Sequence, residues 1–274
     1  LPVLVALTIV VVAPLFLGVY YSFTDWNGIQ TNNFVGFDNY IALFQDERFL
    51  DSLWFTVKFS VVSIFLINAI GLSLALLVTA NLKSNKLLRT IFFMPNLIGG
   101  LILGFIWQFI FTKAFDGFGS LLGIESLQGW LSTSTTGFWA LVILMSWQMS
   151  GYIMVIYIAY LEGISNELLE AAEIDGASPF QRFRLVVFPL VAPAFTVSMF
   201  LTLSNTFKLY DQNLSLTGGG PYNSTQMVAM EIFNTAFGRY EMAYAQSKAV
   251  IFFLIVAAIA LLQVYISKKR EVEM

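Results

Sequence analysis

Two residue types that carry much of enzyme and metal chemistry are missing from this sequence, which contains no cysteine and no histidine. Without cysteine there can be no disulfide framework, no thiol nucleophile and no thiolate metal site. Without histidine the chain lacks the commonest metal ligand and the usual general base. We therefore predict neither a metal site nor a catalytic residue, and we expect that the chain is not an enzyme.

Charged residues are also scarce. They make up 11% of the 274 residues, whereas hydrophobic residues make up 58%. Soluble domains carry about 25% charged and about 45–50% apolar residues, so this composition indicates a membrane protein surrounded by a lipid bilayer. The net charge is only −3, and the sequence has no basic stripe with interleaved aromatic residues. A nucleic-acid partner is therefore not expected.

Several charge-free runs are long enough to cross a membrane, which takes about 20 mainly apolar residues. The first run begins at Leu1 without a methionine, so we expect further residues to precede it. No soluble domain interrupts the series. We predict an all-α membrane protein with a single transmembrane domain over 1–274 and six transmembrane helices at about 3–23, 56–80, 88–112, 138–161, 190–210 and 247–267.

The basic residues are unevenly divided between the two ends of these helices. One end carries Lys83, Lys86, Arg89, Arg182, Arg184, Lys268, Lys269 and Arg270. The loops at the other end hold only Arg48, Lys113 and Arg239. Cytoplasmic loops of membrane proteins are enriched in Lys and Arg. Both termini and the loop 162–189 are therefore predicted to be cytoplasmic.

The cytoplasmic loop 162–189 has the signals of two short helices. Ser165 is placed to cap a helix over 166–175, and Gly176 is placed to end it in a left-handed conformation. Ser178, followed by Pro179 and by Gln181, predicts a capping box at the start of a second helix. A helical hairpin of this kind suits a groove on another protein. The alternative is a helix lying on lipid, but such helices favour Lys and Arg, whereas this loop holds five acids and two bases.

The same loop resembles a known motif. Glu170-Ala171-Ala172, then Gly176, then Val186-x-Phe188-Pro189 is similar to the EAA loop of permease subunits in binding-protein-dependent ABC importers, with Val186 in place of Ile and Phe188 in place of Leu. The resemblance implies the type I ABC importer permease fold, with a coupling helix that docks on a cytoplasmic ATPase subunit. The residues it implies for ATPase coupling are Glu170, Ala171, Ala172, Asp175, Gly176 and Arg182.

Two further stretches, 207–226 and 243–250, resemble carbohydrate permeases of the maltose and multiple-sugar group, and the short outer loops resemble those for raffinose-like oligosaccharides. This resemblance implies the permease subunit of an ATP-driven importer that moves an oligosaccharide across a bacterial cell membrane. It also implies three kinds of partner. These are a second, related permease in a heterodimer, two ATPase subunits that bind ATP and magnesium, and an extracellular sugar-binding protein.

The glycine-rich stretch 217–221 raises the question of a phosphate-binding loop. No Gly-Lys-Ser/Thr follows it, and the whole sequence lacks a Walker-type motif, so the chain is not expected to bind ATP or another cofactor itself. We expect Gly218, Gly219, Gly220 and Pro221 to contact the solute-binding protein, with a plain loop as the alternative. Gly100 and Gly104 form a small-residue face, which can pack against the partner permease or within the chain.

Polar residues inside membrane helices are costly and are candidates for a solute path. Amide groups match sugar hydroxyls, and aromatic rings stack on sugar faces. The candidates for the path are Trp147, Gln148, Tyr152, Asn205, Lys208 and Tyr210. For each of them a helix–helix hydrogen bond or an interfacial contact is the alternative. Lys208 and Asp211 are also spaced to form an ion pair.

Three other functions are weighed against this interpretation. An ion-coupled secondary transporter usually needs carboxylates or histidines at membrane depth, but almost every acid here falls in a predicted loop. An intramembrane enzyme needs a nucleophile–base pair or metal ligands, and no such pair is apparent. An ABC permease for another solute, such as glycerol phosphate, would share the same motifs.

Overall fold

The computed structural model describes residues 2–29, 33–80 and 83–269. Beyond a single bridge between Thr24 and Phe34, these residues contain no β-structure. Among them are six helices that are long and apolar enough to cross a membrane: Pro2–Tyr21, Glu47–Thr79, Gly100–Leu122, Ser134–Leu161, Pro179–Phe207 and Met242–Lys268. The predicted all-α class with six membrane-spanning helices is thereby confirmed.

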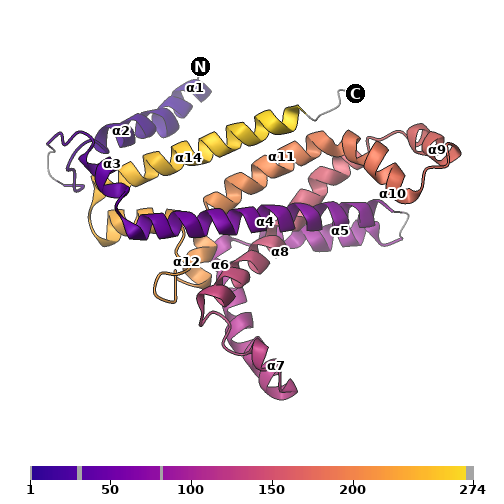
Figure 1. The fold of residues 1–274 in the computed structure, drawn as a ribbon, viewed down its shortest axis with the longest axis horizontal. Helices are drawn as coiled ribbons and strands as arrows, with labels where there is room; N and C mark the ends of the chain where they lie inside the picture. The colour runs from indigo at the N-terminus through magenta and orange to yellow at the C-terminus, as the bar shows by residue number, and fades with distance from the viewer. Residues whose placement is uncertain (1, 30–32, 81–82, 270–274) are drawn as a thin grey trace.

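Short α-helices, π-helical turns and 3₁₀ turns, the last two labelled η, complete the chain (Figure 1). The first half consists of α1 (Pro2–Leu7), η1 (Thr8–Val12), α2 (Ala13–Tyr21), α3 (Asp38–Leu43), α4 (Glu47–Thr79), α5 (Asn85–Phe93), η2 (Met94–Leu97), α6 (Gly100–Phe109), η3 (Ile110–Ala114), α7 (Phe115–Leu122) and η4 (Glu125–Leu127). The second half consists of α8 (Ser134–Leu161), α9 (Asn166–Ile174), α10 (Pro179–Arg182), η5 (Phe183–Val187), α11 (Phe188–Phe207), α12 (Asp211–Leu216), α13 (Val228–Phe233), η6 (Asn234–Gly238) and α14 (Met242–Lys268).

The third span differs from the predicted position of 88–112. The amphipathic helix α5 ends at Phe93, and a tight turn that contains Pro95 separates it from α6, which begins at Gly100. Proline has no backbone N–H and favours an extended residue before it, so it interrupts a continuous helix. The membrane-spanning helix is therefore displaced along the chain to Gly100–Leu122.

The other spans also begin earlier than the apolar runs suggested, and the second and the fifth differ most. Helix α4 starts at Glu47 because the Asp46 carboxylate accepts hydrogen bonds from the backbone N–H groups of Arg48 and Phe49, at 3.0 and 3.3 Å. The fifth span starts at Pro179 and passes through the π-helical turn η5 into α11. Extra turns of helix thus extend the spans beyond their purely apolar cores.

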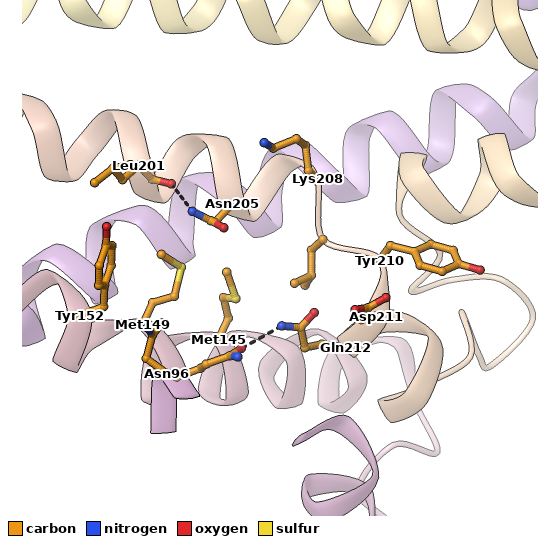
Figure 2. Close-up of a pocket in the computed structure, with 12 residues that line it drawn as sticks. Asn96, Met145, Met149, Tyr152, Leu201, Asn205, Lys208, Tyr210, Asp211 and Gln212 are labelled. Atoms are coloured by element: carbon orange, nitrogen blue, oxygen red, sulfur yellow. Dashed lines mark hydrogen bonds between the residues drawn. The ribbon is translucent and has the colours of Figure 1, made fainter. Parts of the chain in front are cut away.

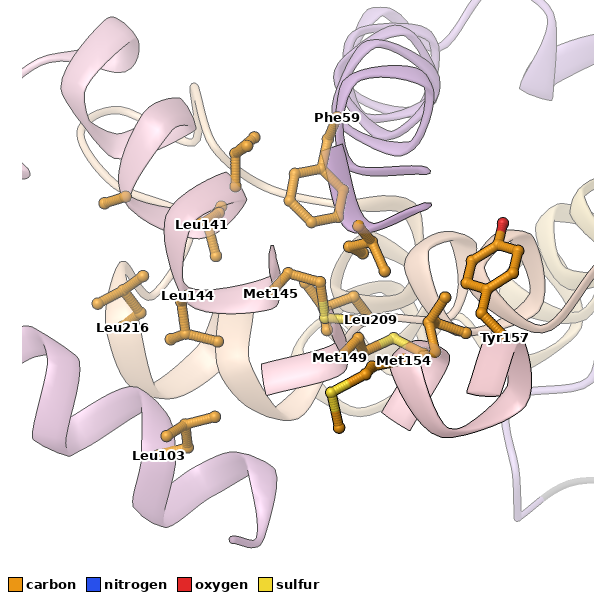
Figure 3. Packing of buried hydrophobic residues seen from close by; sticks show 14 of the residues in the cluster. Phe59, Leu103, Leu141, Leu144, Met145, Met149, Met154, Tyr157, Leu209 and Leu216 are labelled. Atoms are coloured by element: carbon orange, nitrogen blue, oxygen red, sulfur yellow. The ribbon is translucent and has the colours of Figure 1, made fainter. Parts of the chain in front are cut away.

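Helices α4, α8 and α11 form the centre of the protein, and α8 is the most enclosed span. Figure 3 shows apolar side chains packed around α8, among which Phe59 of α4 and Leu144 and Met149 of α8 are buried. A chain of hydrogen bonds crosses the same core. The Tyr157 hydroxyl of α8 donates to Asn68 Oδ1 of α4 at 3.0 Å, and Asn68 Nδ2 donates to Thr202 Oγ1 of α11 at 3.1 Å.

Glycines mark the closest helix contacts. A Cβ at Gly104 would overlap Ser215 of α12, and one at Gly100 would lie 2.9 Å from Asp211 Cβ. The predicted small-residue face of α6 therefore packs within the chain, against α12. Gly151 of α8 lies against α5 in the same way, because a Cβ there would overlap the Phe92 carbonyl group.

We predict that Gly151→Ala destabilises the protein by about 1–3 kcal/mol, because the added methyl group meets backbone atoms that can move only with all of α5. The matched control is Gly117→Ala in α7, where nothing lies within 4 Å of the new Cβ. That substitution should be neutral or slightly stabilising, since alanine favours helix over glycine. Thermal unfolding of the purified protein in detergent measures both. Equal midpoints for Gly151→Ala and the unsubstituted protein would contradict the described packing of α5 on α8.

Candidate functional site

A polar cavity of about 480 Å³ lies between α8, α11 and the start of α12 (Figure 2). Its lining consists of Asn96, Met145, Gln148, Met149, Tyr152, Leu201, Asn205, Lys208, Leu209, Tyr210, Asp211 and Gln212. Five of the six predicted path residues are in this set, and they come from two helices and the segment that follows α11. The structure therefore brings Gln148, Tyr152, Asn205, Lys208 and Tyr210 together around one space.

Hydrogen bonds fix the amides in this lining. Gln212 Nε2 donates to Gln148 Oε1 at 2.8 Å, and Gln148 Nε2 donates to the Ile98 carbonyl oxygen at 3.2 Å. That carbonyl is available because the chain is interrupted between η2 and α6. Asn205 Nδ2 donates to the Leu201 carbonyl oxygen at 2.8 Å, within its own helix. Three segments, α8, α12 and the turn after η2, are thus joined at the cavity by one amide pair.

Two tyrosines and two charged residues complete the polar lining. Burial, with a smaller contribution from the Asp211 charge, raises the pKa of Tyr210, so its hydroxyl stays protonated and able to donate. Lys208 is exposed and forms none of the ion pairs found in the described part of the chain, Asp211 included. The predicted pairing of Lys208 with Asp211 is therefore wrong. Helix α11 ends at Phe207 and α12 begins at Asp211, so the two residues are not neighbours on the face of one helix.

Trp147 lies apart from the other five path residues. It lines an apolar groove of about 710 Å³ formed by α4, α5 and α8, and its ring packs edge-on against Trp107 with centroids 5.6 Å apart. Gln148 and Tyr152 are four residues apart and share one face of α8, whereas Trp147 points to a neighbouring face. Asn96 and Gln212 were not predicted as path residues. The proline next to Asn96 is the signal that could have revealed the exposed turn there.

The hairpin 162–189 has the predicted local structure. Ser165 Oγ accepts from the Leu168 N–H at 3.4 Å, Gly176 has φ = +78°, and Ser178 and Gln181 form a capping box. An ion pair between Arg182 and Glu173 ties α10 to α9. Figure 1 shows the hairpin projecting at one end of the spans, toward the same end as the last turn of α14.

The surface of this hairpin is largely open. None of the residues of α9 is buried, and Ile174 is 86% exposed. Glu170 lies on a pocket of about 540 Å³ that also involves Thr79 at the end of α4 and Arg182. The predicted coupling residues Ala171, Ala172, Asp175 and Gly176 lie on or beside α9, and no atom lies within 4 Å of a Cβ built on Gly176.

The glycine-rich loop folds around a buried asparagine. Asn213 Nδ2 donates to the Thr225 carbonyl oxygen at 2.8 Å, and its Oδ1 accepts from the Met227 N–H at 3.1 Å. Gly218 and Gly219 have positive φ angles of +57° and +81°, which shape the tight turn. Gly220 and Pro221 continue the loop to Tyr222, which is fully exposed at its tip. Tyr222 was not among the predicted residues.

Comparison with known proteins gives consistent matches. Residues 67–272 match the family described as binding-protein-dependent transport system inner membrane component. The chain is 58% identical, over all of its length and 94% of the relative's, to the probable starch degradation products transport system permease protein AmyD of Thermoanaerobacterium thermosulfurigenes. It is 33% identical to the multiple sugar-binding transport system permease protein MsmF of Streptococcus mutans, over 94% of this chain and 90% of the relative.

A solved structure shares the fold. A chain of a bacterial ABC transporter involved in the import of the acidic polysaccharide alginate superposes with a TM-score of 0.85 over 98% of this chain and 93% of that chain, at 19% sequence identity. A chain of the MetNI methionine ABC transporter in an inward-facing conformation gives a TM-score of 0.60 over 86% of this chain and 99% of that chain, at 18% identity.

Proposed function

Because this chain belongs to the family of binding-protein-dependent transport system inner membrane components, a multi-pass membrane permease of ABC importers, we propose that it forms part of the path by which an oligosaccharide is imported. The observation that carries the proposal is the cavity, where amides and tyrosines from separate segments face one space. The relatives named for starch degradation products and for multiple sugars support a carbohydrate as the solute.

The lining suits a sugar chemically. Sugar hydroxyls both donate and accept hydrogen bonds, and the cavity offers amides from Gln148, Asn205 and Gln212 that can do the same. Tyr152 and Tyr210 add aromatic faces and hydroxyls. The cavity volume of about 480 Å³ lies within the range of small-molecule sites, about 300–1,000 Å³.

The energy for transport would come from partner subunits. The sequence has no Walker-type motif, so ATP and magnesium would bind to two ATPase subunits and not to this chain. The exposed hairpin around Glu170 and Gly176 is the proposed docking element for one of them. It joins the end of α8 to the start of the fifth span, and these two helices line the cavity. A movement of the hairpin would therefore displace two cavity walls together.

The remaining surfaces fit the other proposed partners. No residue of the most apolar window of the first span is buried, which leaves its surface for lipid or for a second, related permease. The distribution of basic residues supports a cytoplasmic position, in a bacterial cell, for the hairpin and both termini. The connection between α11 and α14 would then lie outside, where the loop of Gly218 to Tyr222 can meet a sugar-loaded binding protein.

We predict that Asn205→Leu and Tyr152→Ala each lower the rate of sugar uptake at subsaturating substrate by about tenfold or more. The reason is that each removes hydrogen bonding to the sugar, and about 1.4 kcal/mol corresponds to a factor of ten. The measurement is uptake of labelled maltooligosaccharide by proteoliposomes that contain the full transporter. Trp147→Phe is the control, because Trp147 lies on the apolar groove. A larger loss for the control than for the cavity variants would contradict the assignment of the path.

We also predict that Gly176→Trp, or Glu170→Lys combined with Gly176→Asp, uncouples or releases the ATPase without preventing membrane insertion. Gly176 has a positive φ that disfavours other residues, and a large side chain there would stand on the docking surface. Co-purification of the ATPase and sugar-stimulated ATP hydrolysis are the measurements. Gly163→Ala is the control, since its Cβ would make only ordinary contacts. Normal stimulation in the Gly176 variants would refute the docking role.

A further inference from the structure

A lysine is fully buried near the beginning of the last span. Lys248 of α14 has no exposed surface, and its Nζ lies 2.7 Å from Asp46 Oδ2 and 2.7 Å from Glu231 Oε1. It also donates to Thr235 Oγ1 at 3.1 Å. Asp46 precedes α4, and Glu231 belongs to α13, so one ammonium group joins three elements that are distant in sequence. We call Asp46, Glu231, Arg239 and Lys248 the Lys248 cluster.

The carboxylates of the cluster have further partners. Glu231 Oε1 accepts from Arg239 Nη2 at 2.6 Å, and Glu231 Oε2 accepts from Gln226 Nε2 at 2.6 Å. The Tyr244 hydroxyl donates to Asp46 Oδ2 at 3.0 Å, while Asp46 Oδ1 caps α4. Each oxygen of Asp46 and Glu231 is thus occupied. Arg239 Nε also lies 3.4 Å from the more exposed Glu241 Oε2, so three anions surround two cations.

Both carboxylates remain ionised at neutral pH. Burial alone would raise the pKa of Glu231, but the hydrogen bonds and charges of Lys248 and Arg239 outweigh it and hold the pKa below its usual value. Lys248 lowers the pKa of Asp46 against the same effect of burial. Removing the ammonium group alone would leave three anions, Asp46, Glu231 and Glu241, with one guanidinium group.

Stability alone does not account for a buried ionic cluster. Well-packed apolar residues often stabilise a protein as much as a buried ion pair does, whereas ionic groups fix the relative position of the elements that carry them. Here the element that is fixed leads to the cavity. Phe233 follows Glu231 on α13, and its ring packs against the ring of Tyr210 with centroids 5.3 Å apart. Tyr210 lines the cavity.

A second bond holds the start of α13. The Val228 N–H donates to Thr56 Oγ1 of α4 at 3.0 Å, where both residues are buried. Helix α13 is therefore attached to α4 at its first residue and to α14 and Asp46 through Glu231, and it contacts Tyr210 on its remaining side.

We propose that Lys248 is a positioning residue for transport: it locks α13 to the ends of α4 and α14 and thereby sets the position of Tyr210 on the cavity wall. This role rests on the proposed function of the cavity. The lysine itself does not contact the solute. Its influence passes through Glu231 and Phe233 to Tyr210.

The test is a double-mutant cycle for uptake by the reconstituted full transporter. Lys248→Met should lower uptake about tenfold, and Tyr210→Ala should lower it as well. If Lys248 acts through Tyr210, the double variant loses little more than Tyr210→Ala alone. Lys248→Met combined with Asn96→Leu is the matched control, since Asn96 lines the same cavity from η2, and these losses should multiply. Losses that multiply equally in both pairs would overturn the proposal.

Rescue by charge separates positioning from simple packing. Lys248→Arg keeps a cation opposite both carboxylates, so it should retain uptake to within about threefold of the unsubstituted transporter. Adding Glu231→Gln to Lys248→Met removes one anion with the cation but does not restore the link to α13, so uptake should stay low. If Lys248→Met does not assemble, the cycle is run with the Glu231→Gln/Lys248→Met pair as its background. Loss of uptake in Lys248→Arg, or full uptake in the pair, in correctly assembled complexes, would contradict the role.

Hydrogen exchange gives a readout that does not depend on the solute. Backbone amides of 228–238 should exchange about tenfold faster in Lys248→Met than in the unsubstituted complex, and Lys248→Arg should keep their protection. Unchanged exchange in Lys248→Met would overturn the anchoring of α13. If the unsubstituted transporter moved no oligosaccharide while exchange behaved as expected, the proposed function would fail and the anchoring would stand.

Discussion

The structure depends on one constraint, which is that the hydrocarbon layer offers no hydrogen bonds. Each polar group within a span must therefore find a partner in the protein or face a water-filled space. The buried hydroxyls of Ser60, Ser63 and Ser146 have no partner within the described residues, but other polar groups meet this requirement in three different ways. Asn68, Tyr157 and Thr202 bond to one another in the core, Gln148 and Asn205 face the cavity, and Lys248 is neutralised by carboxylates near the helix ends. The first way holds helices together, the second lines the proposed path, and the third, by our proposal, fixes an element beside that path.

The irregular points of the backbone connect these features. The interruption around Pro95 leaves the Ile98 carbonyl free to accept from Gln148, which in turn holds Gln212. The hairpin with its turn at Gly176 joins the two helices that line the cavity. The hairpin is thus connected to the cavity through α8 and the fifth span, and α13 is connected to it through Tyr210. This arrangement supports the proposal that another protein moves the chain through the hairpin.

Features encoded by neighbouring residues were predictable from the sequence. The apolar runs revealed six spans, and Ser165, Gly176 and the Ser178–Gln181 box revealed the hairpin, because caps act over three or four positions. Gln148 and Tyr152 share a face of α8 by the same local rule. The apolar character of 88–112 concealed the break at Pro95, since hydropathy alone does not register a missing backbone donor.

Contacts between distant segments were not predictable in this way. Only the packing of α4, α13 and α14 brings Asp46, Glu231 and Lys248 together. The three residues are far apart in the sequence, so no local pattern predicts the cluster. Lys208 and Asp211 have the spacing of an ion pair on a helix, but α11 ends at Phe207, so the two side chains are not held on one helix face. Trp147 has a suitable side chain for a sugar path, yet it faces the apolar groove because a helix turns by about 100° for each residue.

The central claim is that this chain forms the membrane path of an ATP-driven oligosaccharide importer. The most direct measurement is uptake of labelled maltooligosaccharide into proteoliposomes that contain this chain with a related permease and an ATPase, with the sugar-binding protein outside. The account predicts uptake that requires ATP on the ATPase side and continues when ionophores collapse all ion gradients. Uptake that continues without ATP but stops with the ionophores would contradict it.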